Sequence, residues 1–253
     1  MKREIRDLYY SLVSRDKYLI NDFGHTNLII TAPHGGGMKP LSIPTRKYGK
    51  KLMDTYTRRL SKELIKLLSY SPYYVISDIH RSKVDLNRSI EEAAQGNSKA
   101  EGIWNDWNVY IDWYKDEIDR IYGKGLLIDI HSQGKTKSFQ LGYGISARTY
   151  NRMRNRESYT EKSTLSSLKQ DEYEMIFGEF SIRESLKRYG YDVLTPKDDD
   201  IYFNGGRDIE HFSGNGLGAI QIECPTSVLK KDLNGVAIAL KHAILTFREW
   251  FIV

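Results

Sequence analysis

The sequence predicts a single α/β domain built on a mixed, mostly parallel central sheet with helices on both faces. Short apolar runs rich in Val, Ile and Tyr, bounded by Gly, Pro or Asp, alternate along the chain with longer stretches of helical periodicity. This alternation is typical of parallel sheets that helices cover on both sides. The 253 residues suffice for one large domain with a substantial core, and are few for two independent ones.

The individual elements follow from the local patterns. The apolar runs predict buried strands at residues 27–32, 73–77, 126–130, 139–145 and 217–222, with a weaker candidate at 191–194. Apolar stripes at helical spacing predict helices within residues 52–68, 104–121, 171–188 and 229–247. Residues 148–169 are polar and poorly periodic, so we expect a surface excursion within a single domain spanning residues 1–253.

Composition limits the function classes. Cys224 is the only cysteine, so an intrachain disulfide or a cysteine-based zinc cluster is excluded, and any metal must be held by His, Asp or Glu. The net charge of +5 comes from scattered positive residues, whereas a nucleic-acid-binding face needs a denser stripe interleaved with aromatics. We therefore expect no nucleic-acid partner.

Targeting signals are also missing from the sequence pattern. The first ten residues, MKREIRDLYY, lack the long apolar core of a secretory signal, and no apolar run approaches the length of a membrane span. The expectation is a cytoplasmic protein that has no membrane partner.

Residues able to bind metal or move protons follow the predicted strands. The first strand leads into His34, the second into Asp78 and His80, the third into His131, and a fourth ends at Glu223. In open α/β sheets, ligands bind outside the carboxyl ends of the strands, so these side chains can converge. Two or three histidines with a carboxylate and one open position is the composition of a catalytic zinc site.

Two neighbouring motifs allow more than one interpretation. Gly35–Gly37 is either an ordinary turn or a place where substrate or backbone comes close, because glycine lacks a Cβ. Asp85 to Arg88 offers a guanidinium and the Asn87 amide to a substrate carboxylate or an oxyanion. The same segment also fits a helix N-terminus with an Asp cap and a surface ion pair.

An ordered set of short motifs carries a family resemblance. They are residues 33–36, 81–88, 129–132, 204–207, 211–214 and 220–223. Together they resemble the N-formylglutamate amidohydrolase family, within the zinc carboxypeptidase-like group. The resemblance implies a mixed sheet with flanking helices, a bound zinc ion, and hydrolysis of an amide next to a carboxylate.

The sequence departs from that group at the expected second ligand. Carboxypeptidase-like enzymes commonly place a Glu ligand three residues after the first His, but Gly37 stands there, and no acidic residue follows before Asp54. We expect His80 to supply the third ligand because it lies at a neighbouring strand end, with Asp78 as the alternative. The predicted zinc ligands are thus His34, His80 and His131.

The resemblance and the motif chemistry assign the remaining roles. Glu223 is expected to take the proton of the attacking water and pass it to the leaving nitrogen. Arg88, helped by Asn87, is expected to hold the substrate carboxylate or the oxyanion. Arg207 is either a second carboxylate contact or a surface residue beside a Gly-Gly turn. Asp129 is expected beneath His131, behind the metal.

The predicted substrate is therefore an N-acyl, for example N-formyl, amino acid or a similar carboxylate-bearing amide. Two alternatives stay open: a hydrolase of cell-wall peptides or of a γ-glutamyl polymer, and a non-catalytic binding module on the same fold. A two-metal phosphoesterase or nuclease is disfavoured because few acidic residues cluster at strand ends.

Overall fold

A six-stranded mixed sheet forms the centre of the computed structural model, which describes residues 17–200 and 202–253. Its strand order is β1-β3-β2-β4-β6-β5, in which the four inner strands are parallel and the two edge strands antiparallel to their neighbours. The strands are β1 Leu19–Asp22, β2 Leu28–Ala32, β3 Tyr73–Ser77, β4 Gly125–Gln133, β5 Gln140–Gly142 and β6 Leu217–Pro225. The predicted fold class is confirmed.

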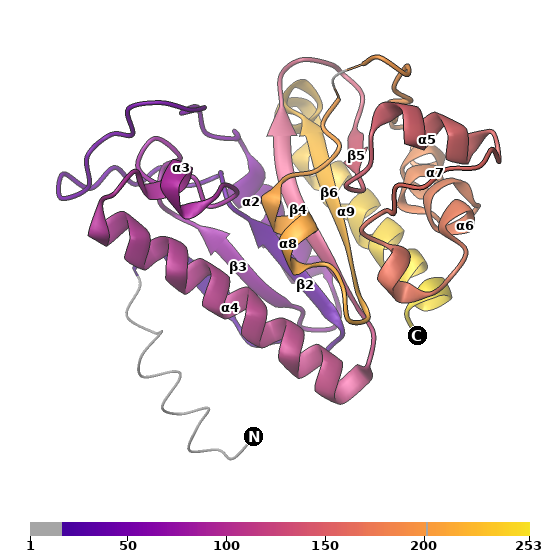
Figure 1. Ribbon diagram of the computed structural model, residues 1–253, viewed down its shortest axis with the longest axis horizontal. Coiled ribbons are helices and arrows are strands. Elements are labelled where there is room, and N and C mark those ends of the chain that lie inside the picture. Colours follow the sequence, from indigo (N-terminus) through magenta and orange to yellow (C-terminus); the bar gives the residue numbers. More distant parts are fainter. Residues whose placement is uncertain (1–16, 201) are drawn as a thin grey trace.

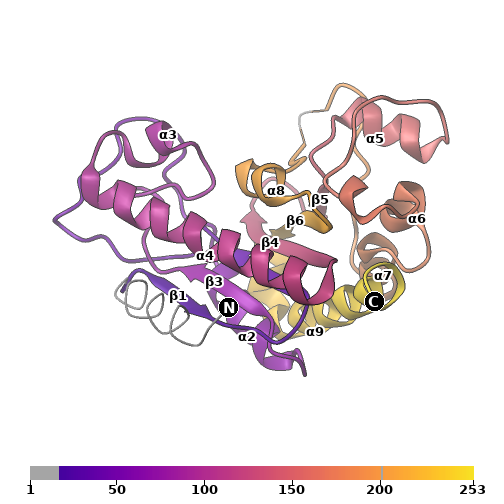
Figure 2. The same cartoon turned by 60° about the horizontal axis from the view of Figure 1, so that its bottom comes forward.

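Helices cover both faces of this sheet. They are α2 Thr57–Leu67, α3 Ile90–Ala94, α4 Ser98–Tyr122, α5 Ala147–Arg154, α6 Glu172–Phe177, α7 Ile182–Arg188, α8 Arg207–Phe212 and α9 Thr226–Phe251, with a 3₁₀ turn at Ser166–Leu168. Figures 1 and 2 show α4 and α8 on one side of the sheet and α9 on the other, where α2 packs against it. Within the described residues, no helix combines the length and apolarity needed to cross a membrane.

The two-residue period of the inner strands divides the core and positions the site. The apolar side chains at even-numbered positions of β4 and β6 join the core beneath α2 and α9, whereas Leu127 belongs to the core beneath α4. On this α4 side the strands turn polar toward their carboxyl ends. Asp129 and His131 follow Leu127 on β4, and Gln221 and Glu223 lie beside them on β6. One edge of the α4 face is therefore a buried polar cluster.

Several predicted element boundaries are wrong. The helix predicted within 52–68 begins only at Thr57, because Tyr56 adopts a left-handed conformation and Leu52 is exposed in the preceding loop. The helix predicted over 171–188 is broken into α6 and α7. Gly178 is extended, and a Cβ there would clash with Glu174.

Strand predictions succeeded in the centre of the sheet and failed at its edges. The strand expected at 139–145 shortens to β5, and the weak candidate at 191–194 makes a single bridge, between Val193 and Phe139. The edge strand β1 carried too little apolar pattern to be predicted. Of residues 148–169, the first part forms α5, which buries Tyr150 and Met153, and residues 154–162 are exposed. The first ten residues, examined for a leader, lie outside the described part.

The glycines after β2 allow the chain to pass close to the backbone of neighbouring segments. A Cβ on Gly35 would lie 2.5 Å from the amide nitrogen of Arg58, and one on Gly36 would lie 2.3 Å from the carbonyl carbon of Asp78. A Cβ on Gly37 would meet nothing within 4 Å. The chain leaving β2 is thus wedged between the start of α2 and the end of β3, which fixes the backbone next to His34.

We expect Gly36→Ala to lower the free energy of unfolding by about 1–3 kcal/mol, because the added methyl forces away the backbone that follows β3. Gly37→Ala, the matched control in the same turn, should change it by less than about 0.5 kcal/mol. Urea denaturation of both variants measures the difference. Equal stability of the two would contradict the packing described.

Candidate metal centre

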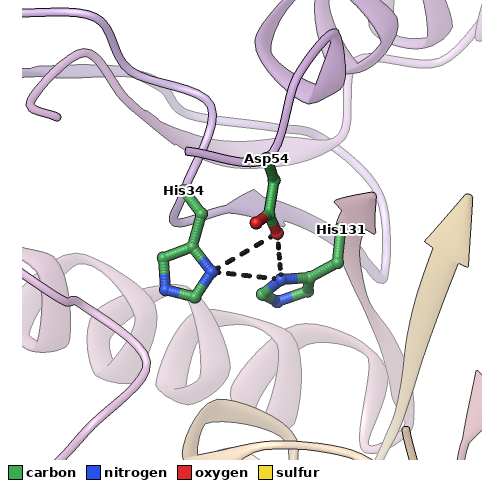
Figure 3. Close-up of side chains that lie close together, drawn as sticks. All are labelled: His34, Asp54 and His131. Carbon is green, nitrogen blue, oxygen red and sulfur yellow. Dashed lines mark hydrogen bonds and ion pairs between the residues drawn. The ribbon is translucent and has the colours of Figure 1, made fainter. Parts of the chain in front are cut away.

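Three buried donors meet at the carboxyl ends of β2 and β4. Nδ1 of His34 and Nδ1 of His131 lie 3.2 Å apart, and Oδ2 of Asp54 lies 3.5 Å from the former and 2.8 Å from the latter (Figure 3). All three residues are almost fully buried. Two histidines and a carboxylate that converge in this way form a donor set suited to a divalent metal such as zinc.

A long loop returns Asp54 to the site. After β2 the chain runs outward, and Asp54 comes back just before α2, where its amide donates to the carbonyl of His34. Its own carbonyl accepts hydrogen bonds from the amide and the hydroxyl of Thr57 at the start of α2. On the other side, the Ser132 hydroxyl donates to the carbonyl of Thr55. The carboxylate is therefore anchored to the elements that carry both histidines.

Two further carboxylates, Asp85 and Asp129, contact the Nε2 atoms of the two histidines. Nε2 of His34 lies 2.6 Å from Asp85, and Nε2 of His131 lies 2.8 Å from Asp129. Asp129 in turn accepts a hydrogen bond from the hydroxyl of Thr31 on β2. Carboxylates of this kind set the tautomer of a metal-binding imidazole and raise its basicity. Both rings are thereby held with Nδ1 directed at the shared centre.

Two buried arginines neutralise the carboxylates around His34. Nε of Arg81 donates to Asp85 at 2.8 Å, and its Nη1 lies 3.6 Å from Asp54. Arg46 donates to Asp85 as well, and also to the carbonyls of Tyr48 and Lys50 in the long loop. Buried charges are tolerated only when paired in this way. Arg46 thus connects the outer loop to the carboxylate that orients His34.

The site favours positive charge between its donors. Burial lowers the pKa of His131, but the Asp129 and Asp54 carboxylates outweigh this effect and hold that pKa well above its ordinary value. Burial raises the pKa of Asp54, but hydrogen bonds with His131 and His34 outweigh it and keep that pKa well below its usual range. A cation at the centre satisfies both preferences, so the residues present fit a divalent metal.

Glu223 lies beside this centre. It pairs in register with His131 across β4 and β6, is buried, and accepts a hydrogen bond from the side-chain amide of Gln221 at 3.2 Å. Burial raises the pKa of Glu223 to about 7, an effect that the nearby His131 partly opposes. A carboxyl group with this pKa can both accept and return a proton near neutrality.

Comparisons with known proteins agree with the predicted fold. No protein-family model matches the sequence, and no curated protein matches it significantly. Among solved structures, N-formylglutamate amidohydrolase from Ralstonia eutropha JMP134 has 13% identity and a TM-score of 0.58, over 92% of this chain and 98% of that chain. The gene product Atu2144 from Agrobacterium tumefaciens has 11% identity and a TM-score of 0.56, over 93% and 96%. The fold resembles that of N-formylglutamate amidohydrolase, and the chemistry must be argued from this chain's own residues.

The structure brings His34 and His131 together, and His80 is not part of their donor group. The ring of His80 accepts a hydrogen bond from the Ser82 amide, and burial together with two lysines lowers its pKa. Asp78, the alternative, forms an ion pair with Arg58. The third residue beside the histidines is Asp54. Sequence reasoning passed over it because it ends no strand, although it is the first acidic residue after His34.

The three residues expected to contact substrate differ in their exposure and in how firmly neighbouring groups hold their side chains. Arg88 keeps a half-exposed guanidinium, with Nε 3.6 Å from the exposed Glu92. Asn87 is buried, with Nδ2 3.3 Å from Nε2 of His131 and Oδ1 accepting from the amide of Asp208.

Arg207 is held by its neighbours. It donates to Asn108 and Asp208 and lies over the ring of Trp104. Asn87 and Arg207 therefore tie α8 to the rest of the site, which leaves the Arg88 guanidinium as the one of these three groups with room to turn toward a ligand.

Asp54→Asn should weaken zinc binding by about 100-fold or more, because it removes the charged donor between the two histidines. His80→Ala, the matched control, should bind zinc as the parent chain does. Competition titration with a chelator of known affinity gives both constants, and circular dichroism checks the fold. Loss of zinc in the His80 variant with retention in the Asp54 variant would refute this ligand set.

Glu223→Gln should stabilise the metal-free protein above neutral pH. The folded-state pKa of about 7 exceeds the ordinary value of 4.5, so the folded chain binds the extra proton, and wild-type stability falls as pH rises between these values. Glutamine has no such dependence, so the variant should exceed the wild type by about 2–3 kcal/mol at pH 8. Near pH 4.5 the gap should close. Chemical denaturation at several pH values measures it, and a gap independent of pH would contradict the shift.

Proposed function

We propose that this chain is a zinc-dependent amidohydrolase that cleaves the amide bond of an N-acyl, for example N-formyl, amino acid or a similar carboxylate-bearing amide. The observation that carries the proposal is the buried His34–Asp54–His131 donor set with Glu223 beside it. A single centre supports hydrolysis of an amide over a two-metal phosphoesterase, since the described residues contain one such group. The two solved structures support the same fold.

The proposed metal ligands are Nδ1 of His34, Nδ1 of His131 and a carboxylate oxygen of Asp54. Zinc held there would lower the pKa of a bound water toward neutrality and polarise the substrate carbonyl. Asp85 and Asp129 keep the two rings in the required tautomer. Their role is to orient the ligands, because they contact Nε2 and not the shared centre.

Glu223 is the proposed proton carrier. It accepts a proton from the attacking water and delivers it to the leaving nitrogen, so that the amide yields a carboxylate and a free amine. Burial raises the pKa of Glu223 to about 7 in the metal-free chain, which favours a carboxyl group that accepts and returns a proton. Gln221 donates to Oε1 of Glu223 and so fixes the orientation of the carboxyl group.

Arg88 is the proposed contact for the substrate carboxylate. Its Nη1 donates to the carbonyl of Asn87, and its Nε is 3.6 Å from Glu92, a long and exposed pairing. A surface ion pair of this kind contributes little, so exchanging Glu92 for a substrate carboxylate costs little. The planar guanidinium can then bind that carboxylate through two donors.

Glu223→Gln should retain zinc and fold while lowering kcat by at least about 100-fold on N-formyl- and N-acetyl-amino acids, because the proton carrier is lost. The control Glu249→Gln, on the exposed end of α9, should leave kcat unchanged. Steady-state assays of released amine measure both. A chain that binds zinc and hydrolyses no member of an N-formyl, N-acetyl and γ-glutamyl panel would instead be a binding module.

Arg88→Lys should reduce kcat/KM on an N-formyl-amino acid by about 10-fold or more, since lysine keeps the charge but loses the two-pronged donor. On the amide-capped analogue, which lacks the carboxylate, kcat/KM should change by less than about twofold. Parallel assays on the two compounds make the comparison. An equal loss of kcat/KM on both compounds would indicate that Arg88 contacts the oxyanion. No loss on either compound would indicate that Arg88 pairs only with Glu92.

A further inference from the structure

Three segments far apart in the sequence meet beyond the carboxyl ends of β4 and β6. The Nζ atoms of Lys50 and Lys135 lie 5.9 and 4.9 Å from the centre of the Phe203 ring. Lys50 comes from the long loop before α2, Lys135 from the loop after β4, and Phe203 from the segment before α8. The latter two segments lie beyond the β4 and β6 arrowheads in Figure 1. Two ammonium groups on one ring are at cation–π distance.

Both lysines belong to the chain that delivers the metal-site residues. Lys50 precedes Asp54 by four residues and Lys135 follows His131 by four, a separation of at most about 14 Å in an extended chain. The backbone of Lys50 is fixed by the buried Arg46, and Phe203 by a hydrogen bond from its amide to Gln140. The positive charge of Lys50 also reaches Glu223, whose pKa it lowers. The two lysines are therefore carried by the same chain segments as the metal-site residues, and Lys50 lies close enough to act on Glu223.

Neither ammonium group is neutralised. Elsewhere on the surface Lys66 and Lys187 pair with glutamates, whereas among residues 17–200 and 202–253 no carboxylate lies within ion-pair distance of Lys50 or Lys135. Because both ammonium groups lie near the same ring, a carboxylate that reaches both would be stabilised by two unpaired positive charges.

We propose that Lys50, Lys135 and Phe203 form a specificity subsite for a second carboxylate, carried on the acyl part of the substrate. The inference rests on the proposed amidohydrolase function, in which Arg88 takes the carboxylate on the amine part. The preferred substrates are then amides of dicarboxylic acids with an amino acid. Water replaces the nitrogen on the acyl carbon, which releases the dicarboxylate and the free amino acid.

The test compares N-succinyl-L-glutamate with N-butanoyl-L-glutamate, whose acyl chains have equal length and differ in a terminal carboxylate. On the zinc-loaded protein, kcat/KM should be at least about fivefold higher for the succinyl compound, and the preference should shrink as salt rises. The double variant Lys50→Met/Lys135→Met should lose the preference, because its kcat/KM falls far more for the succinyl compound than for the butanoyl compound. Lys137→Met, an exposed lysine that lines a separate cavity with Tyr191 and Asp232, should keep it.

Calorimetric binding of the same two compounds to the zinc-loaded Glu223→Gln variant measures the preference without turnover. Hydrolysis of both compounds at equal efficiency, with equal affinities, would overturn the subsite and leave the amidohydrolase proposal standing. Selective binding without hydrolysis by the wild type would overturn the amidohydrolase proposal and support the subsite. A preference that survives in the double variant would assign the second carboxylate to other residues and overturn the proposal.

Discussion

The arrangement of the site depends on two buried imidazole rings that face each other through Nδ1. Their Nδ1 atoms lie 3.2 Å apart, and the Asp54 carboxylate lies 2.8 Å from Nδ1 of His131, so all three donors point at one centre. Four neighbouring charged residues hold the rings in that orientation. Asp85 and Asp129 hold the outer nitrogens, and Arg46 and Arg81 compensate the buried carboxylates. Burial of so many ionised groups is costly unless all are paired, and a buried cluster of this kind is more typical of a functional site than of a stabilising one.

The fold forms the cluster because the side chains on one face of the sheet change from apolar to polar along β4 and β6. On the α4 side, β4 and β6 begin with apolar residues in the core and finish with Asp129, His131, Gln221 and Glu223. The register of the parallel strands then sets His131 beside Glu223, the proposed ligand next to the proposed proton carrier. The loop between β2 and α2 completes the site. Its glycines press against β3 and α2, and its far end returns Asp54 to His34.

The sequence predicts the site residues that follow strands, but it does not predict Asp54, which a long loop brings to the site. Apolar runs identified the inner strands, and their shared carboxyl edge placed His34, His131 and Glu223 near one another. Asp54 stands 20 positions beyond His34 and follows no strand, so only the three-dimensional path of the loop reveals its place. His80 was chosen by the same strand-end rule, which does not tell in which direction a side chain points. The edge strands and the α6–α7 break escaped because pairing and local packing, not apolar periodicity, decide them.

The most direct test of the central claim is a crystal structure of the zinc-bound protein with anomalous diffraction at the zinc edge. One ion should be bound by Nδ1 of His34, Nδ1 of His131 and a carboxylate oxygen of Asp54, at distances of about 2.0–2.2 Å. Glu223 should lie close to the ion without binding it, and Asp85 and Asp129 should stay on the Nε2 atoms. Zinc bound through Nε2, or at His80 with Asp54 turned away, would contradict the account.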